Sequence, residues 1–291
     1  MRRTVFGLVC VLFSILPAIA DEWDEATAAY EAGRYQEAIQ LMTPLAEAGM
    51  AQAQSTLAHI YSFGHGTAID DAAAYDWMLR AAEQGDAGAQ SKLGQLYLLG
   101  QGVEKDEAQA LYWISLAADQ YEPAALYNLA TMTMHGIGME ADPAAGINLY
   151  YAAITLDEPN SIYALSQVYM EGKYEPADID LGLQFLVWAA QLGHRRASAV
   201  LATVLQEIPE VEHNLVKSAI HYQIAIARGC DDLGKPAARA IARLSPQELA
   251  MYEYNVTDSI PAVERAAHDH EPSTGHCLSE NNYELAARAE P

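Results

Sequence analysis

The chain repeats itself every 36 residues. A leucine, an alanine and a residue suited to capping a helix each recur at this interval in five successive copies. A period of this length is typical of a solenoid, in which each repeat buries its apolar face against the next one. Because solenoids mostly present binding surface, the period also favours an interaction function over catalysis. The recurring positions are Leu57, Leu93, Leu129, Leu165 and Leu201; Ala81, Ala117, Ala153, Ala189 and Ala225; and Asp70, Asp106, Asp142, Asp178 and Asn214.

Each period is predicted to be a pair of helices. Two apolar stripes at helical spacing are separated by a short polar segment that ends in the capping residue, which would accept backbone N–H bonds at the start of the second helix. In the unit from Ala53 to Gly85, the stripes are Ala53, Leu57, Ile60 and Tyr61 in the first helix, and Ala74, Trp77 and Ala81 in the second.

Glycine is predicted to end the first helix in four copies. It adopts the left-handed conformation that closes a helix at little energetic cost. A second glycine follows two residues later in three of these copies. The first set is Gly64, Gly100, Gly136 and Gly172, and the second is Gly66, Gly102 and Gly138.

The segment from Leu93 to Val103, which reads LGQLYLLGQGV, resembles the Sel1-like repeat closely. Asp106, Ala110 and Trp113 extend the resemblance into the second helix. It implies an all-α, right-handed superhelical solenoid of antiparallel helix pairs, related to tetratricopeptide repeats. It also implies a scaffold or adaptor function, and for exported bacterial members a role in envelope regulation or host interaction.

The resemblance covers about residues 51–230 as five tandem copies. The fifth copy departs from the pattern, because Ile208 and Glu210 replace both glycines. Its loop between the helices must therefore close differently from the other four.

The flanking segments are predicted to cap the solenoid. Residues 21–50 hold a shorter helix pair of the tetratricopeptide type, and residues 231–261 hold C-terminal capping helices. Residues 262–291 are polar and are predicted to form a flexible tail.

Residues 1–20 are predicted to be a secretory signal peptide. Arg2 and Arg3 precede an apolar run of about 12 residues, and Ala18–Ala20 forms an A-x-A cleavage site before Asp21. The run is shorter than the roughly 20 residues that span a bilayer. We therefore expect a periplasmic or secreted protein, with the uncleaved anchor as the alternative.

The chain is strongly acidic, with 39 acidic against 16 basic side chains and a formal net charge of −23. Such a field repels nucleic acids and anionic lipids, whose phosphates need lysine and arginine partners. A protein or peptide partner is then expected to be neutral or basic. The alternative is that the charge serves only solubility.

Two cysteines remain after cleavage, Cys230 and Cys277. An even number in an oxidising compartment predicts one disulfide between them. The alternative is two free thiols.

The sequence holds no catalytic motif of the S-x-x-K, G-x-S-x-G or H-E-x-x-H type, so we expect no enzyme activity and no cofactor. A cluster of possible zinc ligands lies in the tail, but its spacing matches no known zinc finger. A solvated tail without metal is therefore the preferred interpretation. The cluster is His268, His270, His276 and Cys277.

The face of the first helices opposite the apolar stripe is predicted to line the concave side. It is more apolar than solvation requires, and aromatic and methionine side chains are favoured at binding surfaces. It is a candidate groove for an extended peptide or a helix. The alternative is that the solenoid curls enough to bury part of this row. The candidate residues are Phe63, Leu98, Leu99, Tyr127, Met134, Tyr163 and Met170.

Together these features predict an exported, non-catalytic adaptor or regulator that binds a protein in the bacterial envelope. Two alternatives belong to other classes: an envelope enzyme acting on peptidoglycan or β-lactams, and a secreted factor directed at a host. The resemblance links β-lactam chemistry to a cysteine-rich branch, whose cysteine pairs this chain lacks.

Overall fold

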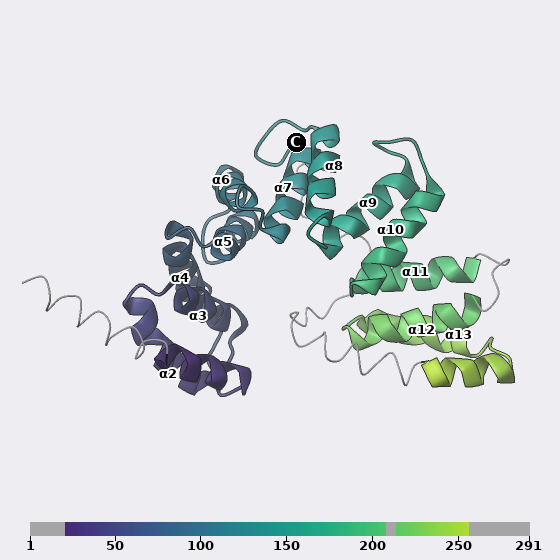
Figure 1. The fold of residues 1–291 in the computed structure, drawn as a ribbon, viewed down its shortest axis with the longest axis horizontal. Helices are drawn as coiled ribbons and strands as arrows, with labels where there is room; N and C mark the ends of the chain where they lie inside the picture. The colour runs from purple at the N-terminus through teal and green to yellow at the C-terminus, as the bar shows by residue number, and fades with distance from the viewer. Residues whose placement is uncertain (1–20, 208–213, 256–291) are drawn as a thin grey trace, which may run out of the picture. The chain divides into compact units, whose positions relative to one another are not determined.

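The computed structural model describes residues 21–207 and 214–255, and every regular element among them is helical (Figure 1). The described chain divides into two compact units, one ending at Ala141 and the other beginning at Asp142, which we call unit 1 and unit 2. No helix in these residues has the length and apolar composition needed to cross a membrane.

Unit 1 is a series of helices that pack one on the next. A helix over residues 21–31 shares one buried apolar cluster with α2, and the two form the first pair. α3 with α4 and α5 with α6 form the next two. α7 then packs on α6. The bounds are α2 (Tyr35–Glu47), α3 (Ala51–Phe63), α4 (Asp71–Glu83), α5 (Ala87–Leu99), α6 (Glu107–Ala118) and α7 (Pro123–His135).

Unit 2 continues the same arrangement of helix pairs. α9 packs against α10, and α11 against α12, while η1 and α13 cover the end of α12. A last helix spans residues 246–255. The bounds are α8 (Pro143–Ile154), α9 (Pro159–Glu171), α10 (Ile179–Gln191), α11 (Arg195–Glu207), α12 (Asn214–Ala227), η1 (Asp231–Leu233) and α13 (Gly234–Ile241).

The periodic leucines and alanines form the core, as predicted, with one exception. Leu57, Leu93 and Leu165 are fully buried, whereas Leu129 is only half-buried. The prediction for the tryptophans was wrong in detail, because Trp77 and Trp113 are half-buried and the next residue along takes the buried place. This buried position also recurs every 36 residues, as Met78, Ile114, Tyr150, Leu186 and Tyr222.

The predicted aspartate caps of the second helices are confirmed. The side chains of Asp70, Asp106, Asp142 and Asp178 each accept a hydrogen bond of 3.0 Å from the backbone N–H three residues on. The side chain of Asn214, the fifth predicted cap, lies outside the described part of the chain, so this cap remains a prediction. A second periodic set of caps, which the sequence analysis missed, begins the first helices: Asp86, Glu122, Glu158 and His194.

The glycines adopt the predicted left-handed conformation. Gly100 ends α5 with φ 67°, and Gly102 follows with φ 70°. Gly102 has a further role, because a Cβ on it would collide with the carbonyl oxygen of Asp71 at the start of α4. The side-chain amide of Gln101 donates to the Asp71 carboxylate at 2.9 Å. The loop between α5 and α6 is therefore docked on the preceding repeat.

The C-terminal helices follow the sequence closely. Ser245 and Glu248 form a capping box before the helix over residues 246–255, with the Ser245 N–H donating to Glu248 at 2.9 Å. Cys230 is buried and disulfide-bonded. Its predicted partner Cys277, the signal peptide and the histidines of the tail all lie outside the described residues, so these remain predictions.

Candidate functional site

The structure keeps part of the predicted binding row on the surface. Phe63 and Leu99 occupy the same position in consecutive repeats, at the last residue of α3 and of α5. Leu99 is 55% exposed and Phe63 is half-buried. The ammonium group of Lys92 lies 5.8 Å from the centre of the Phe63 ring, which is a cation–π contact.

The prediction that Tyr163 is a surface anchor was wrong. Tyr163 is only 2% exposed, because its ring stacks on His194 at 4.5 Å with an interplanar angle of 24°. Its hydroxyl accepts a hydrogen bond from Gln167. Tyr163 is therefore a core residue of unit 2.

A second position of the row also turns inward. Met170 packs over Gly182 of α10, where even a Cβ would come within 2.5 Å of the Met170 side chain. Leu98 and Met134 share the position of Met170 in their own repeats; Met134 is 5% exposed and Leu98 is half-buried. The alternative stated above, burial of part of the row, therefore holds for Met134 and Tyr163. Tyr127 is half-buried.

Around Phe63, aromatic and imidazole rings from three helices and a loop gather into one group, which we call the aromatic cluster. It comprises Tyr30, Tyr35, His59, Phe63 and His65. Tyr35 stacks on His65 with ring centres 4.6 Å apart, and His59 lies 4.5 Å from Phe63. The Tyr30 hydroxyl and His59 Nδ1 are hydrogen-bonded at 3.1 Å.

Local backbone geometry holds this cluster together. Gly66, with φ 67°, lies so close to Tyr35 that a Cβ on it would approach the Tyr35 Cβ to 2.7 Å. This contact positions the preceding residue, His65, over the Tyr35 ring. Phe63 could be predicted from its position in the repeat. The two tyrosines could not, because they come from the irregular N-terminal pair.

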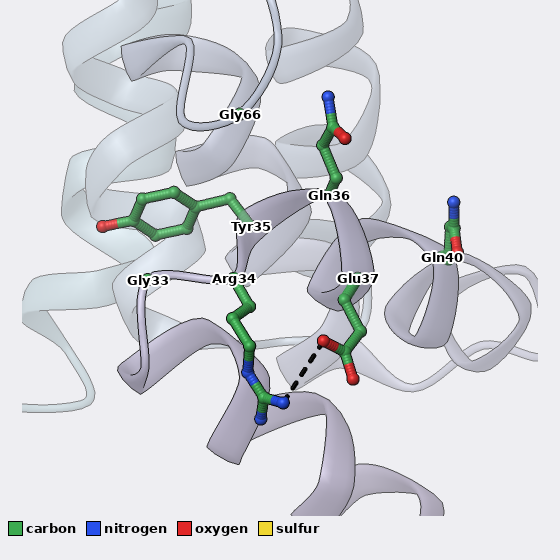
Figure 2. A pocket seen from close by; sticks show the side chains of 7 residues that line it. All are labelled: Gly33, Arg34, Tyr35, Gln36, Glu37, Gln40 and Gly66. Carbon is green, nitrogen blue, oxygen red and sulfur yellow. Dashed lines mark ion pairs between the residues drawn. The ribbon is translucent and has the colours of Figure 1, made fainter.

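A shallow, open pocket of about 490 Å³ adjoins the cluster at the start of α2, and Tyr35 belongs to both. Figure 2 shows Arg34 and Glu37 facing each other as an ion pair of 3.4 Å, with Gln36 and Gln40 on the same helix. The lining residues are Gly33, Arg34, Tyr35, Gln36, Glu37, Gln40 and Gly66.

Unit 1 is strongly acidic. Residues 21–141 contain 18 acidic and 4 basic side chains. Two of the cations pair with carboxylates, Arg34 with Glu37 and Lys105 with Glu107. The other two, Arg80 and Lys92, lie over aromatic rings. Unit 1 therefore carries a strong net negative charge.

The described residues contain no cluster of side chains suited to holding a metal ion. Between residues 21 and 255, with the gap at 208–213, no three His, Cys, Asp or Glu side chains converge as ligands.

Two pairs of tyrosine hydroxyls, Tyr75 with Tyr97 and Tyr151 with Tyr169, are hydrogen-bonded to each other. Burial raises the pKa of Tyr75 to about 12, so this phenol stays protonated and structural at neutral pH.

Solved structures of the same fold include three bacterial proteins. A Sel1 repeat protein from Oxalobacter formigenes shares 24% identity, with a TM-score of 0.66 over 81% of this chain and 99% of that one. The protective antigen c5321 of uropathogenic Escherichia coli shares 22%, with a TM-score of 0.58 over 88% of this chain and 58% of that one. Immunity protein Pa5087 from Pseudomonas aeruginosa shares 22%, with a TM-score of 0.51 over 80% and 88%. No curated protein sequence matches the chain.

The Sel1 repeat model matches four segments: residues 51–86, 87–121, 123–158 and 159–194. The match stops before the fifth predicted copy, which lacks both loop glycines although α11 and α12 pack as a pair. Sel1 repeats generally mediate protein–protein interaction. The family match, the glycine-closed helix pairs and the fold of the solved relatives agree, and the chain therefore belongs to the Sel1-repeat family.

Proposed function

We propose that this protein is an exported, non-catalytic adaptor or regulator of the bacterial envelope that binds a basic segment of a partner protein on unit 1. The aromatic cluster is the observation that carries the proposal, because it joins half-exposed rings to a strongly acidic surface in a fold used for protein interaction. The predicted signal peptide supports the location.

The chemistry of the surface selects the partner. Lys92 already lies over Phe63, and Arg80 lies over Trp77 at 4.7 Å, so the exposed ring faces of this unit accept cations. The unpaired carboxylates of unit 1 add long-range attraction for lysine and arginine. A basic segment with one apolar residue could place that residue beside Phe63 and Leu99.

The test is a binding measurement with defined peptides on the mature chain from Asp21. A labelled peptide of alternating lysine and leucine is compared with one of alternating glutamate and leucine by fluorescence anisotropy. We expect only the basic peptide to bind, and its affinity to fall as salt rises. Phe63→Ala combined with Leu99→Ala should weaken binding about 30-fold or more, as loss of aromatic and apolar anchors commonly does.

The matched control is Tyr112→Ala, which removes a ring that is 54% exposed on α6, away from the cluster. It should leave the affinity unchanged, and circular dichroism should show unchanged helicity in both variants. Equal losses in the two variants, or equal binding of the two peptides, would overturn the proposed site. If the basic peptide binds as expected, a partner is captured from envelope extract and sequenced to identify the natural segment.

A further inference from the structure

Unit 2 contains a positively charged corner where α10 meets α11. Arg195 and Arg196 are the first two residues of α11, and Arg228 follows the end of α12. α11 packs against both α10 and α12 (Figure 1). All three arginines are half-buried. We call these three residues the arginine corner.

The helix at this corner lacks the negative cap found elsewhere in the chain. α5, α7 and α9 begin with the carboxylates of Asp86, Glu122 and Glu158. At the same position of α11 stands His194, whose Nδ1 accepts the Ala197 N–H at 2.9 Å. Burial, and then the nearby arginines, lower the pKa of His194 to about 3, so this cap is neutral.

The start of α11 is therefore more positive than the starts of α5, α7 and α9. The partial positive charge of a helix N-terminus favours acidic side chains in the first turn. Arg195 and Arg196 occupy that turn instead. The Arg228 guanidinium lies beside the residue before His194, because a Cβ on Gly193 would meet its central carbon at 3.4 Å.

Arg228 has a structural role in which only some of its guanidinium N–H donors are used. In two earlier repeats the same position is glutamine, at Gln84 and Gln120, and in the two repeats after those it is leucine. Gln84 donates to Gln54, which donates to the buried carbonyl of Ala46. The partner position in the last repeat is Ser198, which is too short for this relay. Arg228 reaches across alone, and its Nη1 donates to the Ala190 carbonyl at 3.2 Å.

The hydrogen bond to the Ala190 carbonyl does not neutralise the positive charge of Arg228. In the described part of the chain neither Arg196 nor Arg228 forms an ion pair, although the chain has 39 acidic side chains. Burial alone lowers the pKa of Arg228, with no neighbouring carboxylate opposing the shift. A half-buried guanidinium without a counter-charge is costly, and the remaining donors of its planar fork are suited to an oxyanion.

We propose that the arginine corner is an oxyanion-binding site, which holds a phosphate or carboxylate group between Arg196, Arg228 and the first turn of α11. Helix N-termini bind such groups readily, and here two guanidinium groups are added. The site lies in unit 2 and does not depend on the aromatic cluster of unit 1.

The test is an NMR titration of the full mature chain at pH 7 and constant ionic strength, with chloride as the balancing anion. Inorganic phosphate and acetate are titrated separately while the arginine Nε–Hε signals and the amides of residues 195–198 are followed. We expect saturable shifts that are confined to these signals. Binding of phosphate alone assigns a phosphate ligand, and binding of acetate assigns a carboxylate ligand.

Arg196→Gln should weaken this binding at least tenfold without changing the melting temperature, because Arg196 makes no hydrogen bond or ion pair in the described chain. Arg239→Gln is the matched control, since it removes an exposed arginine of α13. Arg228→Lys keeps the charge but loses the fork, and should weaken phosphate binding while preserving the fold. Equal loss in the Arg239 variant, or no saturation by either anion, would overturn the proposal.

Discussion

At the scale of single residues, the turn after the second helix shows how the repeat tolerates departures from its own pattern. Glycine fills this position in four repeats and adopts φ between 90° and 98°, at Gly49, Gly85, Gly193 and Gly229. Tyr121 and Asp157 take the same place and still have positive φ, 59° and 54°. A tyrosine with positive φ is strained. Because Tyr121 is 73% exposed, packing of its ring offsets little of this strain.

We predict that Tyr121→Gly stabilises the protein. Glycine accepts positive φ without steric cost, so the free energy of unfolding should rise by about 1 kcal/mol, less the extra chain entropy of glycine. Thermal unfolding followed by circular dichroism measures the change. Tyr121→Ala is the control, because it removes the ring but keeps the strain, and it should stay near the parent value. A lower melting temperature for the glycine variant would show that the ring stabilises the fold.

His194 makes the stability of unit 2 depend on pH. Its folded pKa of about 3 lies below the ordinary value of 6.5, so the unfolded chain binds a proton first. This contribution to stability is complete above pH 6.5 and is lost as the pH falls toward 3. The slope is up to about 1.4 kcal/mol for each pH unit.

The prediction is tested between pH 6.5 and 5, where most carboxylates remain ionised. Urea unfolding of the parent chain should show the loss, and His194→Asn should show a smaller slope, because asparagine caps a helix but does not titrate. His221, whose pKa burial lowers to about 4, keeps a second contribution in both proteins. Identical slopes in the two proteins would exclude His194 as the source.

At the scale of helices and loops, the two loop glycines of the three repeats that have both perform different functions. The first closes the helix, and a Cβ on Gly100 would meet Lys105 no closer than 3.4 Å. The second touches the preceding repeat: Gly102 lies against Asp71, and a Cβ on Gly138 would come within 2.7 Å of the Glu107 carbonyl oxygen. The repeats are thus joined by backbone contacts as well as by apolar side chains.

We predict that Gly102→Ala destabilises the protein much more than Gly100→Ala. Both variants place a Cβ at positive φ, which costs about 1 kcal/mol. Only the Gly102 variant also forces α4 and the loop apart, which should bring its cost to roughly 2–4 kcal/mol. Chemical denaturation of the two variants measures the difference. Equal losses would mean that the loop relaxes without disturbing the preceding repeat.

At the scale of the whole molecule, the disulfide of Cys230 is predicted to tie the C-terminal segment to unit 2. A bond to Cys277 would close a loop of about 48 residues, and loop entropy puts its contribution at about 4 kcal/mol. Protein from an oxidising compartment should therefore show no free thiol under non-reducing denaturation, and peptide mapping should recover the linked pair. Two titratable thiols per mature chain would contradict the pairing.

Export is predicted at the same scale. The mature protein should begin at Asp21, because the A-x-A site precedes it. N-terminal sequencing of protein recovered from the periplasm or the medium measures this directly. A sequence that still begins at Met1 would contradict cleavage.

Much of the fold could be predicted because the repeat is built from local rules. The 36-residue period, the aspartate caps and the helix-ending glycines depend on hydrogen bonds and backbone angles within a few residues of each position. The leucine stripe was correct for Leu57 and Leu93, but Leu129 is more exposed than its copies. The period does not show how completely each copy is covered by its neighbours.

The sequence by itself determined that this is a Sel1-type chain of helix pairs with an acidic surface, because period, caps and charge are properties of the residues themselves. Only the tertiary structure decided which of the row's side chains reach solvent. Met170 turns onto Gly182, and Tyr163 lies under His194, since the direction of a side chain depends on the helix packed against it. The same holds for the arginine corner, whose members come from two helix ends far apart in sequence and meet only where α11 packs between α10 and α12.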